Sequence, residues 1–325
     1  MIYCVVYDLK KVLITGGFGF IGGRLSQHLE TLGYKVYIAS RASRKKPSWL
    51  KRGEIIQIDW SDTKSLHSAC LGKDCIVHAA GMNAAECVAD PTIALDFNGV
   101  ASGRLAEEAT SAGVKKFIYL STAHVYNSNL SGVINEESRP QNTHPYATSK
   151  IAGEKYVIKN HKKNNMQCMI VRLANAFGAP THGDANCWML FVNDLCMQAT
   201  TNRKIVILSA SNIFRNFITL TDVCTGLEFI ISRDFSTNLP KVYNIGDKSK
   251  TLIEMASIIR DTYSEIRNID IPIVELSEKT EHKQNLEYRS KLIKSEGWHA
   301  TSNFSFEIRE LIEFCEAKFV CNGSI

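Results

Sequence analysis

The sequence predicts an α/β protein built on a doubly wound parallel sheet, followed by a smaller C-terminal lobe. A glycine cluster within residues 12–25 (VLITGGFGFIGGRL) joins a short apolar run to a helix-period pattern, which indicates a tight strand-to-helix turn. From there apolar runs alternate with helix-period stretches, the pattern of parallel strands joined by helical crossovers. The expected strands are 36–39, 55–58, 75–80, 116–120 and 167–173, and the expected helices are 20–32, 63–71, 99–113 and 146–160.

The glycine-rich turn is a candidate site for the pyrophosphate of a dinucleotide. Gly16 permits the tight turn, Gly19 has no side chain to block the pyrophosphate, and Gly22 lets the helix pack closely. The helix N-terminus, at Phe20 and Ile21, offers free N–H groups to the anion. A glycine triplet by itself also occurs in purely structural turns. Its position after a strand and before a helix favours the dinucleotide site, and with it a Rossmann-like fold.

The end of the second strand indicates which dinucleotide is bound. An acidic residue there usually binds the ribose hydroxyls of NAD, whereas an arginine accommodates the additional phosphate of NADP. This sequence has Ser40 in the acidic position, followed by Arg41 and Arg44. Arginine offers an anionic phosphate charge-assisted hydrogen bonds, which favours NADP, with NAD as the alternative. The alternative is that these arginines belong to an ordinary solvated basic loop, which would show the same sequence pattern.

Two further strand ends complete the expected cofactor site. Asp59 and Trp60 end the third strand, where a carboxylate can accept a hydrogen bond from the adenine amino group. Ala79, Ala80 and Gly81 end the fourth strand and are small enough for the cofactor to pass. We therefore expect these five residues to contact the cofactor.

Length and composition exclude several other classes of protein. With 325 residues, 45% hydrophobic and 22% charged, the chain can bury a large core in one two-lobed unit or in two domains. The net charge of +5 is spread along the chain and requires no nucleic-acid partner. Ten cysteines without metal-ligand spacing predict no metal site and fit reduced thiols in the cytoplasm. No apolar run is long enough for a signal peptide or a membrane span, and residues 1–10 are assigned no function.

The chemistry is expected from Tyr146 and Lys150. Residues four apart share one face of a helix, so the lysine ammonium can lie near the tyrosine phenol and lower its pKa. Tyr146 would then serve as a general acid or base. The same spacing also occurs by chance in surface helices. Thr122 supports the catalytic interpretation, because it ends the fifth strand at the sheet edge where open α/β sheets bind ligands.

Together these motifs resemble the extended short-chain dehydrogenase/reductase family, which comprises NAD(P)-dependent nucleotide-sugar epimerases, dehydratases and reductases. The resemblance covers nearly the whole chain. Besides the acidic pair Asp59 and Asp62, the motifs that carry it are T-G-G-F-G-F-I-G (15–22), H-A-A-G (78–81), S-T-A-H-V-Y (121–126), Y-A-T-S-K (146–150), R-L-A-N-A-F-G (172–178), F-R-N-F-I-T-L-T-D-V (214–223), Y-N-I-G (243–246), and S-K-L followed by E-G-W (290–298).

The resemblance implies a role for each site residue. Thr122 would hydrogen-bond the reacting sugar oxygen, Tyr146 would transfer the proton, and Lys150 would tune Tyr146 and bind the nicotinamide ribose. Asn175 and Arg215 would contact the nucleotide-sugar substrate near its diphosphate. Asn175 could instead cap a turn, whereas burying Arg215 without an anionic partner would be costly.

The expected organisation has two parts. A cofactor domain spans about 11–175, with a segment near 212–245 returning to it, and 176–325 form mainly a substrate-binding lobe that closes over the cleft. The family resemblance implies a homodimer, in which the helices near 99–113 and 146–160 form a four-helix interface.

Departures from the family pattern narrow the reaction. The family's dehydratases carry an acidic pair directly after the hydroxyl residue, whereas this chain has Ala123 and a histidine, His124, that we expect to be structural. Dehydration is therefore not expected. An epimerase regenerates its cofactor on every turnover and usually holds NAD, whereas a reductase consumes NADPH. Since Ser40 and Arg41 favour NADPH, we predict reduction of a nucleotide-linked 4-keto sugar, with 4-epimerisation as the alternative. A non-enzymatic NADP sensor is a further alternative, which the intact catalytic residues disfavour.

Overall fold

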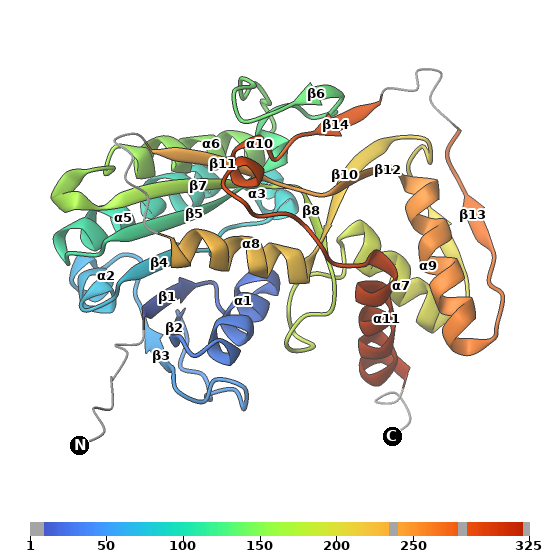
Figure 1. The fold of residues 1–325 in the computed structure, drawn as a ribbon, viewed down its shortest axis with the longest axis horizontal. Coiled ribbons are helices and arrows are strands. Elements are labelled where there is room, and N and C mark those ends of the chain that lie inside the picture. Colours follow the sequence, from blue (N-terminus) through green and yellow to red (C-terminus); the bar gives the residue numbers. More distant parts are fainter. Residues whose placement is uncertain (1–9, 234–239, 279–284, 321–325) are drawn as a thin grey trace. The chain divides into compact units, whose positions relative to one another are not determined.

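The computed structural model describes residues 10–233, 240–278 and 285–320, which divide into two units (Figure 1). Unit 1 comprises the chain up to Leu120 together with Thr148–Ile170 and Ile231–Lys241. Unit 2 comprises Ser121–Ala147, Val171–Ile230 and the chain from Val242 onward. Each unit therefore contains segments that are distant in sequence. The expected domain bounds, with 11–175 and a returning segment at 212–245, stay a prediction.

A seven-stranded sheet confirms the predicted fold class. Its strand order is β11-β7-β5-β4-β1-β2-β3, and β3, β2, β1, β4 and β5 pair in parallel register. The bounds are β1 Lys11–Thr15, β2 Lys35–Ser40, β3 Glu54–Gln57, β4 Cys75–His78, β5 Lys116–Thr122, β7 Gln167–Leu173 and β11 Lys241–Ile245. The order reverses between β1 and β4. Open α/β sheets bind ligands beyond the carboxyl ends of the strands at such a point.

The strands of unit 1 form because their sequences are apolar on both faces. Val12, Leu13 and Ile14 of β1 are fully buried, as are Val36 and Ile38 of β2. A parallel sheet that helices cover on both faces needs such continuous apolar runs, and burial of each side chain stabilises the fold by about 1.5–3 kcal/mol. The five predicted strands are confirmed as β2, β3, β4, β5 and β7, each within two residues of its predicted bounds.

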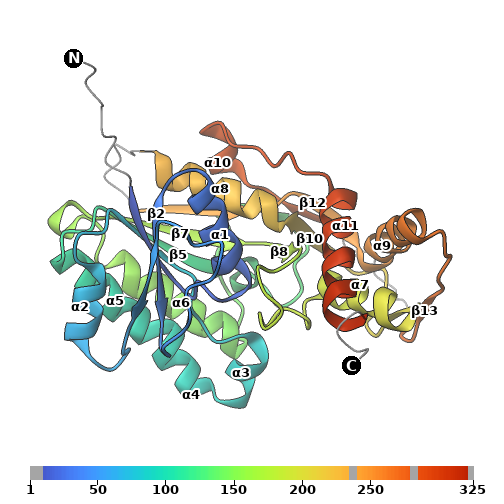
Figure 2. The same ribbon diagram turned by 90° about the horizontal axis from the view of Figure 1, so that it is seen from below.

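Helices cover both faces of the strands of unit 1. Figure 2 shows α1 on one face, with α2 and α5 side by side on the other. The bounds are α1 Phe20–Thr31, α2 Thr63–Cys70, α3 Ala84–Ala89, α4 Pro91–Ala94, α5 Ser102–Ser111, α6 Pro145–Ile158 (in this unit from Thr148 onward) and the short η3 Lys163–Asn165. Helix α2 begins where the Asp62 carboxylate accepts hydrogen bonds from the N–H groups of Lys64 and Ser65. The predicted helices 20–32, 63–71 and 146–160 are confirmed.

The predicted helix 99–113 differs from the observed one, because it begins as a π-helix. This segment, η1 (Leu95–Ala101), leads directly into α5. The Asn98 carbonyl accepts hydrogen bonds from the hydroxyls of Ser102 and Tyr119, at 2.8 and 2.9 Å. This carbonyl is therefore not reserved for the backbone hydrogen bonds of the helix. Packing here is close, since a Cβ at Gly153 would overlap both the Tyr119 hydroxyl and the Asn98 carbonyl. Single π-helical turns of this kind are frequent at functional sites.

The described residues of unit 2 form three small sheets. In the sheet β12-β10-β8, strand β10 is antiparallel to β12 and parallel to β8, and the pairs β13-β9 and β14-β6 are parallel. The bounds are β6 Gly132–Ile134, β8 Asn175–Phe177, β9 Ile205–Ile207, β10 Phe214–Thr219, β12 Lys248–Thr251, β13 Ile273–Glu275 and β14 Leu286–Tyr288.

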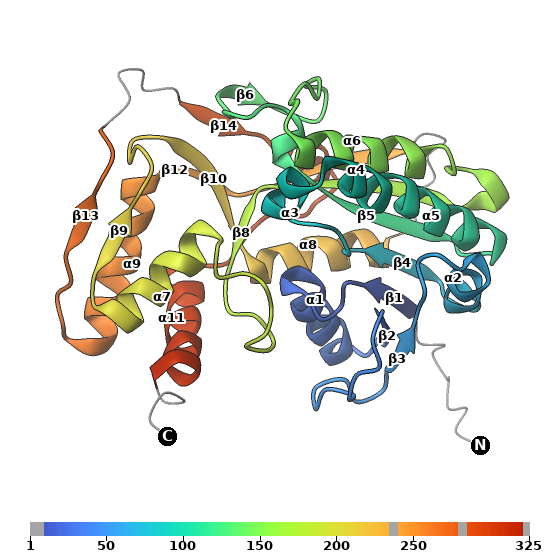
Figure 3. The ribbon, with the colours of Figure 1, turned by 180° about the vertical axis from the view of Figure 1, so that it is seen from behind.

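Three helices of unit 2 pack against one another, namely α7, α9 and α11 (Figure 3). Their shared core includes the fully buried side chains of Ile259 and Ile308, with Leu195 1% exposed. The bounds are η2 Ala123–Val125, α7 Phe191–Asn202, α8 Leu220–Ser232 (in this unit up to Ile230), α9 Leu252–Arg267, α10 Lys291–Ser295, α11 Phe304–Cys315 and η4 Glu316–Val320. Within the described part of the chain, no helix has both the length and the apolar character needed to cross a bilayer.

Candidate active site

The glycine-rich turn lies at the carboxyl end of β1, beside the end of β4. Gly16 has φ +69°, and a Cβ there would lie 2.8 Å from the Ala80 backbone nitrogen. A Cβ at Gly22 would overlap the Gly16 carbonyl oxygen, and one at Gly19 would lie 3.1 Å from the same oxygen. Gly16 is therefore required by its positive φ and by its close approach to the segment after β4, and Gly22 by packing within the turn. Gly17, which the sequence analysis did not select, is equally constrained, because its Cβ would lie 2.5 Å from the Ile38 side chain.

The first turn of α1 offers its N–H groups without a side-chain cap. Gly19 occupies the N-cap position in an extended conformation, and its own N–H donates to the Gly16 carbonyl at 2.8 Å. Phe20 and Ile21 are the first two residues of the helix, and Phe20 is buried. The N-terminus of α1 therefore fits an anion such as a pyrophosphate, as the helix dipole and free N–H groups favour negative charge there.

The basic loop after β2 holds the residues expected at the NADP phosphate. The Arg44 guanidinium carbon lies 4.8 Å from the centroid of the Phe18 ring, which places Arg44 beside the glycine-rich turn. Arg41 is exposed, and its backbone carbonyl accepts a hydrogen bond from Gln57 at 3.3 Å. The Ser40 hydroxyl donates to the Ala42 carbonyl at 2.7 Å, so its proton is used within the loop. The side chains of Arg41 and Arg44 can therefore donate to a phosphate, whereas the hydroxyl proton of Ser40 is already used.

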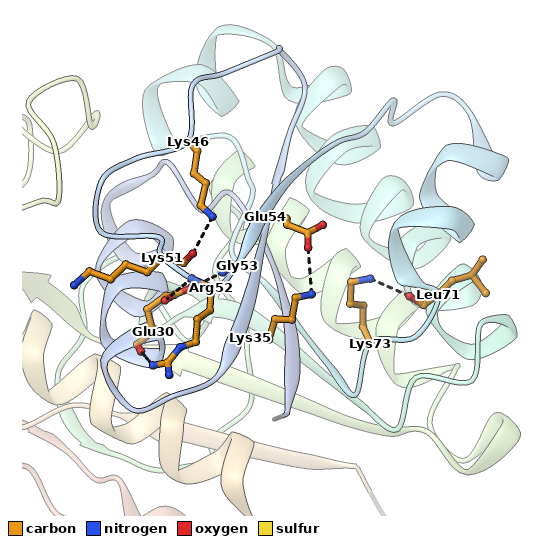
Figure 4. A network of polar contacts seen from close by, with 9 residues as sticks. All are labelled: Glu30, Lys35, Lys46, Lys51, Arg52, Gly53, Glu54, Leu71 and Lys73. Carbon is orange, nitrogen blue, oxygen red and sulfur yellow. Dashed lines mark hydrogen bonds and ion pairs between the residues drawn. The ribbon is translucent and has the colours of Figure 1, made fainter. Parts of the chain in front are cut away.

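The far end of this loop is anchored by Glu30 of α1 (Figure 4). The Glu30 carboxylate accepts hydrogen bonds from the backbone N–H groups of Arg52 and Gly53, the latter at 2.6 Å, and the Arg52 guanidinium donates to the Glu30 carbonyl at 2.9 Å. Lys46 donates to the Lys51 carbonyl at 3.0 Å. Arg52 and Lys46 therefore stabilise the loop itself. In this they differ from Arg41 and Arg44, which are the residues expected at the phosphate.

Asp59 and Trp60 follow β3. One Asp59 carboxylate oxygen accepts hydrogen bonds from the Ser61 hydroxyl at 2.6 Å and from its N–H at 2.9 Å, and these bonds lower the pKa of Asp59. The ring of Trp60 packs against those of His78 and Phe97, with centroids 5.6 and 5.3 Å away. Asp59 is thus held as a carboxylate on an ordered turn, as a hydrogen-bond acceptor for an adenine must be.

The segment after β4, residues 79–81, is held at both ends. The Ala80 N–H donates to the Thr15 hydroxyl oxygen at 3.3 Å, and the Met82 N–H donates to the Asn98 side-chain oxygen at 2.8 Å. A Cβ at Gly81 would lie 3.0 Å from that Asn98 oxygen and 3.5 Å from the Lys150 ammonium. The absence of a side chain at Gly81 therefore leaves room for Lys150. Asn98 was missed by the sequence analysis, because nothing in the local pattern indicates that its amide faces residue 82.

Lys150 is a buried cation on α6. Its side chain is 5% exposed, and its ammonium lies 4.5 Å from the centroid of the Tyr119 ring. Burial lowers the pKa of Lys150 to about 8, although the negative charge of Glu154, one turn further along the helix, opposes this shift. Tyr146 lies four residues before Lys150 on the same helix, so the two side chains share a helix face.

Thr122 ends β5 in unit 2 and begins the η2 turn. Its side chain is 6% exposed, and its hydroxyl oxygen accepts the His124 N–H at 3.2 Å. Because the oxygen is an acceptor in this bond, the hydroxyl proton is left for donation to a ligand. Tyr146 lies in the first turn of α6, where its backbone N–H donates to the His144 Nδ1 atom at 3.2 Å.

Asn175, Arg215 and His124 meet in unit 2. The Asn175 amide donates to the Asn216 carbonyl at 2.8 Å and hydrogen-bonds the His124 side chain. Burial, together with the charge of Arg215 and the neighbouring His144, lowers the pKa of His124 and keeps its ring neutral. Burial also lowers the pKa of Arg215. Its guanidinium carbon lies 5.7 Å from the centroid of the Phe191 ring, and no acidic side chain of the described residues pairs with it. A partly buried arginine in this state is suited to bind an anionic ligand.

No metal centre accompanies these residues in the described ranges, where no three His, Cys, Asp or Glu side chains are grouped to hold an ion. The chemical groups that remain are a phenol, a hydroxyl, a buried ammonium and an arginine. These can transfer a proton to a substrate oxygen, hydrogen-bond it and bind an anion.

Comparison with known proteins finds one matching family and similar proteins that are named as dehydratases or epimerases. The family described as "NAD dependent epimerase/dehydratase family" matches residues 12–246. The chain is 26% identical to the mouse (Mus musculus) dTDP-D-glucose 4,6-dehydratase over 95% of its length and 90% of that protein. It is 32% identical to the UDP-glucose 4-epimerase of Neisseria meningitidis serogroup C over 54% of its length and 56% of that protein. The solved UDP-N-acetylglucosamine 4-epimerase of Methanobrevibacter ruminantium M1 superposes with a TM-score of 0.81 at 23% identity, covering 96% of this chain and 99% of that one.

Proposed function

Because the chain belongs to the NAD dependent epimerase/dehydratase family, we propose that it is an NADP(H)-dependent oxidoreductase that reduces the 4-keto group of a nucleotide-activated sugar. The family membership confirms the resemblance to the extended short-chain dehydrogenase/reductases. The observation that carries the proposal is the buried Lys150 cation one helical turn from Tyr146, an arrangement that prepares a phenol for proton transfer.

The residues of unit 1 fit a dinucleotide. A side chain at Gly22 would overlap the turn and one at Gly16 the segment after β4, and the first turn of α1 offers N–H groups to a pyrophosphate. Arg41 and Arg44 would bind the 2′-phosphate, Asp59 and Trp60 the adenine, Ala79, Ala80 and Gly81 would line the path of the cofactor, and Lys150 would bind the nicotinamide ribose. When bound, the nicotinamide supplies the hydride.

Three side chains would act on the sugar oxygen. Tyr146 gives its phenolic proton to the carbonyl oxygen as the carbon is reduced, which leaves a phenolate. Lys150 stabilises that phenolate, because a cation near a phenol favours the charged form. Thr122 donates its hydroxyl proton to the same oxygen and holds it in place. General acid–base catalysis of this kind contributes about 10²–10⁴-fold to the rate.

Substrate binding would rest on Arg215 and Asn175. The partly buried guanidinium of Arg215 has no acidic partner among the described residues, and a diphosphate would supply two negative charges. Asn175 hydrogen-bonds both the Asn216 carbonyl and His124, so it can orient a neighbouring group of the substrate.

A 4-epimerase that holds NAD is the second candidate. The family's description and the name of the Neisseria relative favour it. Arg41 and Arg44 of the loop after β2, the latter beside the glycine-rich turn, favour the NADPH-dependent reductase instead. Dehydration is disfavoured, although the mouse relative is a dehydratase, because Ala123 and the neutral His124 stand where an acidic pair would be needed. An NADP sensor would have no use for the Tyr146 and Lys150 pair.

Exposed apolar side chains on unit 1 fit a homodimer, and the free cysteines fit a location in the cytoplasm. Val88, Ile93 and Leu95 are 55%, 56% and 47% exposed on adjoining helical segments of unit 1, and Tyr156 of α6 is 37% exposed. Clustered exposed apolar side chains are typical of protein interfaces. The eight cysteines in the described residues are buried and form no disulfide, which fits a reducing compartment.

The test is to mix the protein and NADPH with a panel of nucleotide-4-ketohexoses and, separately, with nucleotide hexoses. Loss of 340 nm absorbance in proportion to an added ketosugar supports the reductase. Interconversion of two hexoses without net consumption of the cofactor would establish the epimerase instead. NADPH binding that changes the affinity of another protein, with no hydride transfer to any sugar, would indicate the sensor.

A further inference from the structure

Asn142 joins the two segments of unit 2 that carry the proposed catalytic hydroxyls. Thr122 begins the η2 turn, whereas Tyr146 lies in the first turn of α6, and 24 residues of sequence separate them (146 minus 122). The Asn142 side chain is 9% exposed and lies where the segment leading to α6 crosses the η2 turn. Its backbone N–H also donates to the Val125 carbonyl at 3.2 Å, which fixes the amide against the turn.

The side-chain amide of Asn142 makes one hydrogen bond to each segment. Its Nδ2 donates to the His124 carbonyl at 2.7 Å, and its Oδ1 accepts the His144 N–H at 2.9 Å. The two partners determine the orientation of the amide, because a carbonyl can only accept and an N–H can only donate. Aspartate cannot replace it fully, as a carboxylate has no donor, and alanine has neither group.

Each partner of Asn142 continues to a proposed catalytic residue. The His124 N–H donates to the Thr122 hydroxyl oxygen at 3.2 Å. On the other side, the His144 Nδ1 atom accepts the Tyr146 N–H at 3.2 Å and so caps the start of α6. The Nδ1 atom is the acceptor in this bond, so the side chain of His144 holds the backbone of the first turn of α6. An unbroken series of hydrogen bonds therefore runs from the Thr122 side chain to the Tyr146 backbone.

We propose that Asn142 is a positioning residue, which sets the register of Tyr146 relative to Thr122 so that both hydroxyls reach the same substrate oxygen. This inference rests on the proposed function, in which the substrate oxygen is the carbonyl oxygen of the keto sugar. Both groups must be aligned at once, and a misplacement of about 1 Å can cost on the order of 10²-fold in rate. Asn142 is suited to this task because it is itself buried and its side chain makes short hydrogen bonds to both segments.

The experiment compares Asn142→Ala with wild type and with Gln141→Ala, a matched control whose exposed side chain makes no such bond. We expect Asn142→Ala to bind NADPH within about twofold of wild type and to lose about 10- to 100-fold in kcat. The kinetic isotope effect on kcat, measured with NADPH deuterated at the transferred position, should rise. A misaligned site slows the chemical step, whereas a smaller folded fraction lowers the rate without changing the isotope effect.

His144 provides a second variant on an exposed position, in case Asn142→Ala does not fold. His144→Ala removes the acceptor for the Tyr146 N–H, and we expect the same rise in isotope effect with a smaller loss of kcat. His144→Asn restores a side-chain acceptor that is favoured at N-caps, and we expect it to recover most of the rate. An unchanged isotope effect in both Asn142→Ala and His144→Ala would overturn the proposal.

A measurement without turnover separates this proposal from the proposed function. Crystal structures of wild type and Asn142→Ala should show a longer distance between the Thr122 Oγ1 and Tyr146 Oη atoms in the variant. An unchanged distance would overturn the positioning role, even if no keto sugar is reduced. Absence of NADPH oxidation by wild type with every sugar, together with the longer distance, would reject the proposed reaction but support the role of Asn142 in setting the register.

Discussion

The Arg44 guanidinium carbon lies 4.8 Å from the centroid of the Phe18 ring, so a residue of the basic loop contacts a residue of the glycine-rich turn. A cation over an aromatic face is attracted by the ring quadrupole, with about 0.5–1 kcal/mol at an exposed site. This relationship connects the loop expected to bind the 2′-phosphate with the turn expected to bind the pyrophosphate.

The proposed preference for NADP(H) can be tested at the two arginines of this loop. Arg44→Ala and Arg41→Ala should each weaken NADPH binding about 10- to 100-fold while changing NADH binding little, since a charge-assisted bond to phosphate contributes about 1.5–3 kcal/mol. Titration of intrinsic NADPH and NADH fluorescence measures both affinities. Lys46→Ala is the control, because Lys46 donates to the Lys51 carbonyl within the loop. Equal losses for the two cofactors would show that the arginines do not contact the phosphate.

Replacing the Tyr146 phenol should separate catalysis from binding. Tyr146→Phe should keep NADPH affinity and lose about 10²-fold or more in turnover, the usual share of a general acid. Tyr156→Phe on the same helix is the matched control, since Tyr156 is partly exposed and has no proposed role in the reaction. Stopped-flow measurement of hydride transfer would test this, and full activity of Tyr146→Phe would remove Tyr146 from the mechanism.

The buried Lys150 predicts an alkaline loss of activity. Its pKa is about 8, so the cation that stabilises the Tyr146 phenolate is present below this pH and is lost as the pH rises through it. We expect kcat/KM to fall above about pH 8. In the window between about 8 and the ordinary value of 10.5, the unfolded chain holds the Lys150 proton more tightly, so the contribution of this residue to stability rises with pH. Chemical denaturation at each pH would show that the lost activity is not unfolding.

His78 predicts a loss of stability in acid. Thr15 donates to its Nδ1 atom at 2.6 Å, and its Nε2–H donates to Ser102 at 2.8 Å, because the Ser102 hydroxyl itself donates to the Asn98 carbonyl. Burial lowers the pKa of His78 from 6.5 to about 3. As the pH falls from about 6.5 toward 3, the unfolded chain takes up the proton that the folded chain excludes, so stability decreases.

Urea unfolding between pH 7 and 4 would measure this decrease, which His78 can account for to the order of 3 kcal/mol at pH 4. His78→Leu should lower stability at pH 7 but flatten the pH dependence. Replacement of the exposed His299 should leave the slope as in wild type. A His78→Leu variant with an unchanged slope would assign the acid sensitivity to other groups.

The exposed apolar patch on unit 1 predicts a dimer. Ile93→Asp places a charge on α4, between the contacting segments α3 and η1 that carry the exposed Val88 and Leu95, which should shift the protein from dimer to monomer in sedimentation at micromolar concentration. Leu208→Asp on unit 2 is the control, because Leu208 is 71% exposed but lies outside the patch. A wild-type protein that sediments as a monomer would contradict the dimer.

Local patterns in the sequence predicted the strands of the central sheet other than β11, together with the candidate residues. Strand and helix periods, the glycine spacing at 16, 19 and 22, and the four-residue spacing of Tyr146 and Lys150 all concern residues within one or two turns of chain. Their backbone geometry follows from sterics and burial alone, so the predicted strands agree with the observed ones within two residues.

Only the tertiary structure decided which polar groups are already paired. Arg52 and Arg44 belong to the same basic stretch of the sequence. In the structure, Arg52 is hydrogen-bonded to Glu30, 22 residues earlier in the chain, whereas Arg44 lies over the Phe18 ring. The Asn98 carbonyl in the π-helical segment accepts a hydrogen bond from the Tyr119 hydroxyl, and the Asn142 amide, which we propose sets the register of Tyr146, donates to the His124 carbonyl. Such hydrogen bonds join segments far apart in the chain, and their geometry is set by the packing of whole elements, which no local period encodes.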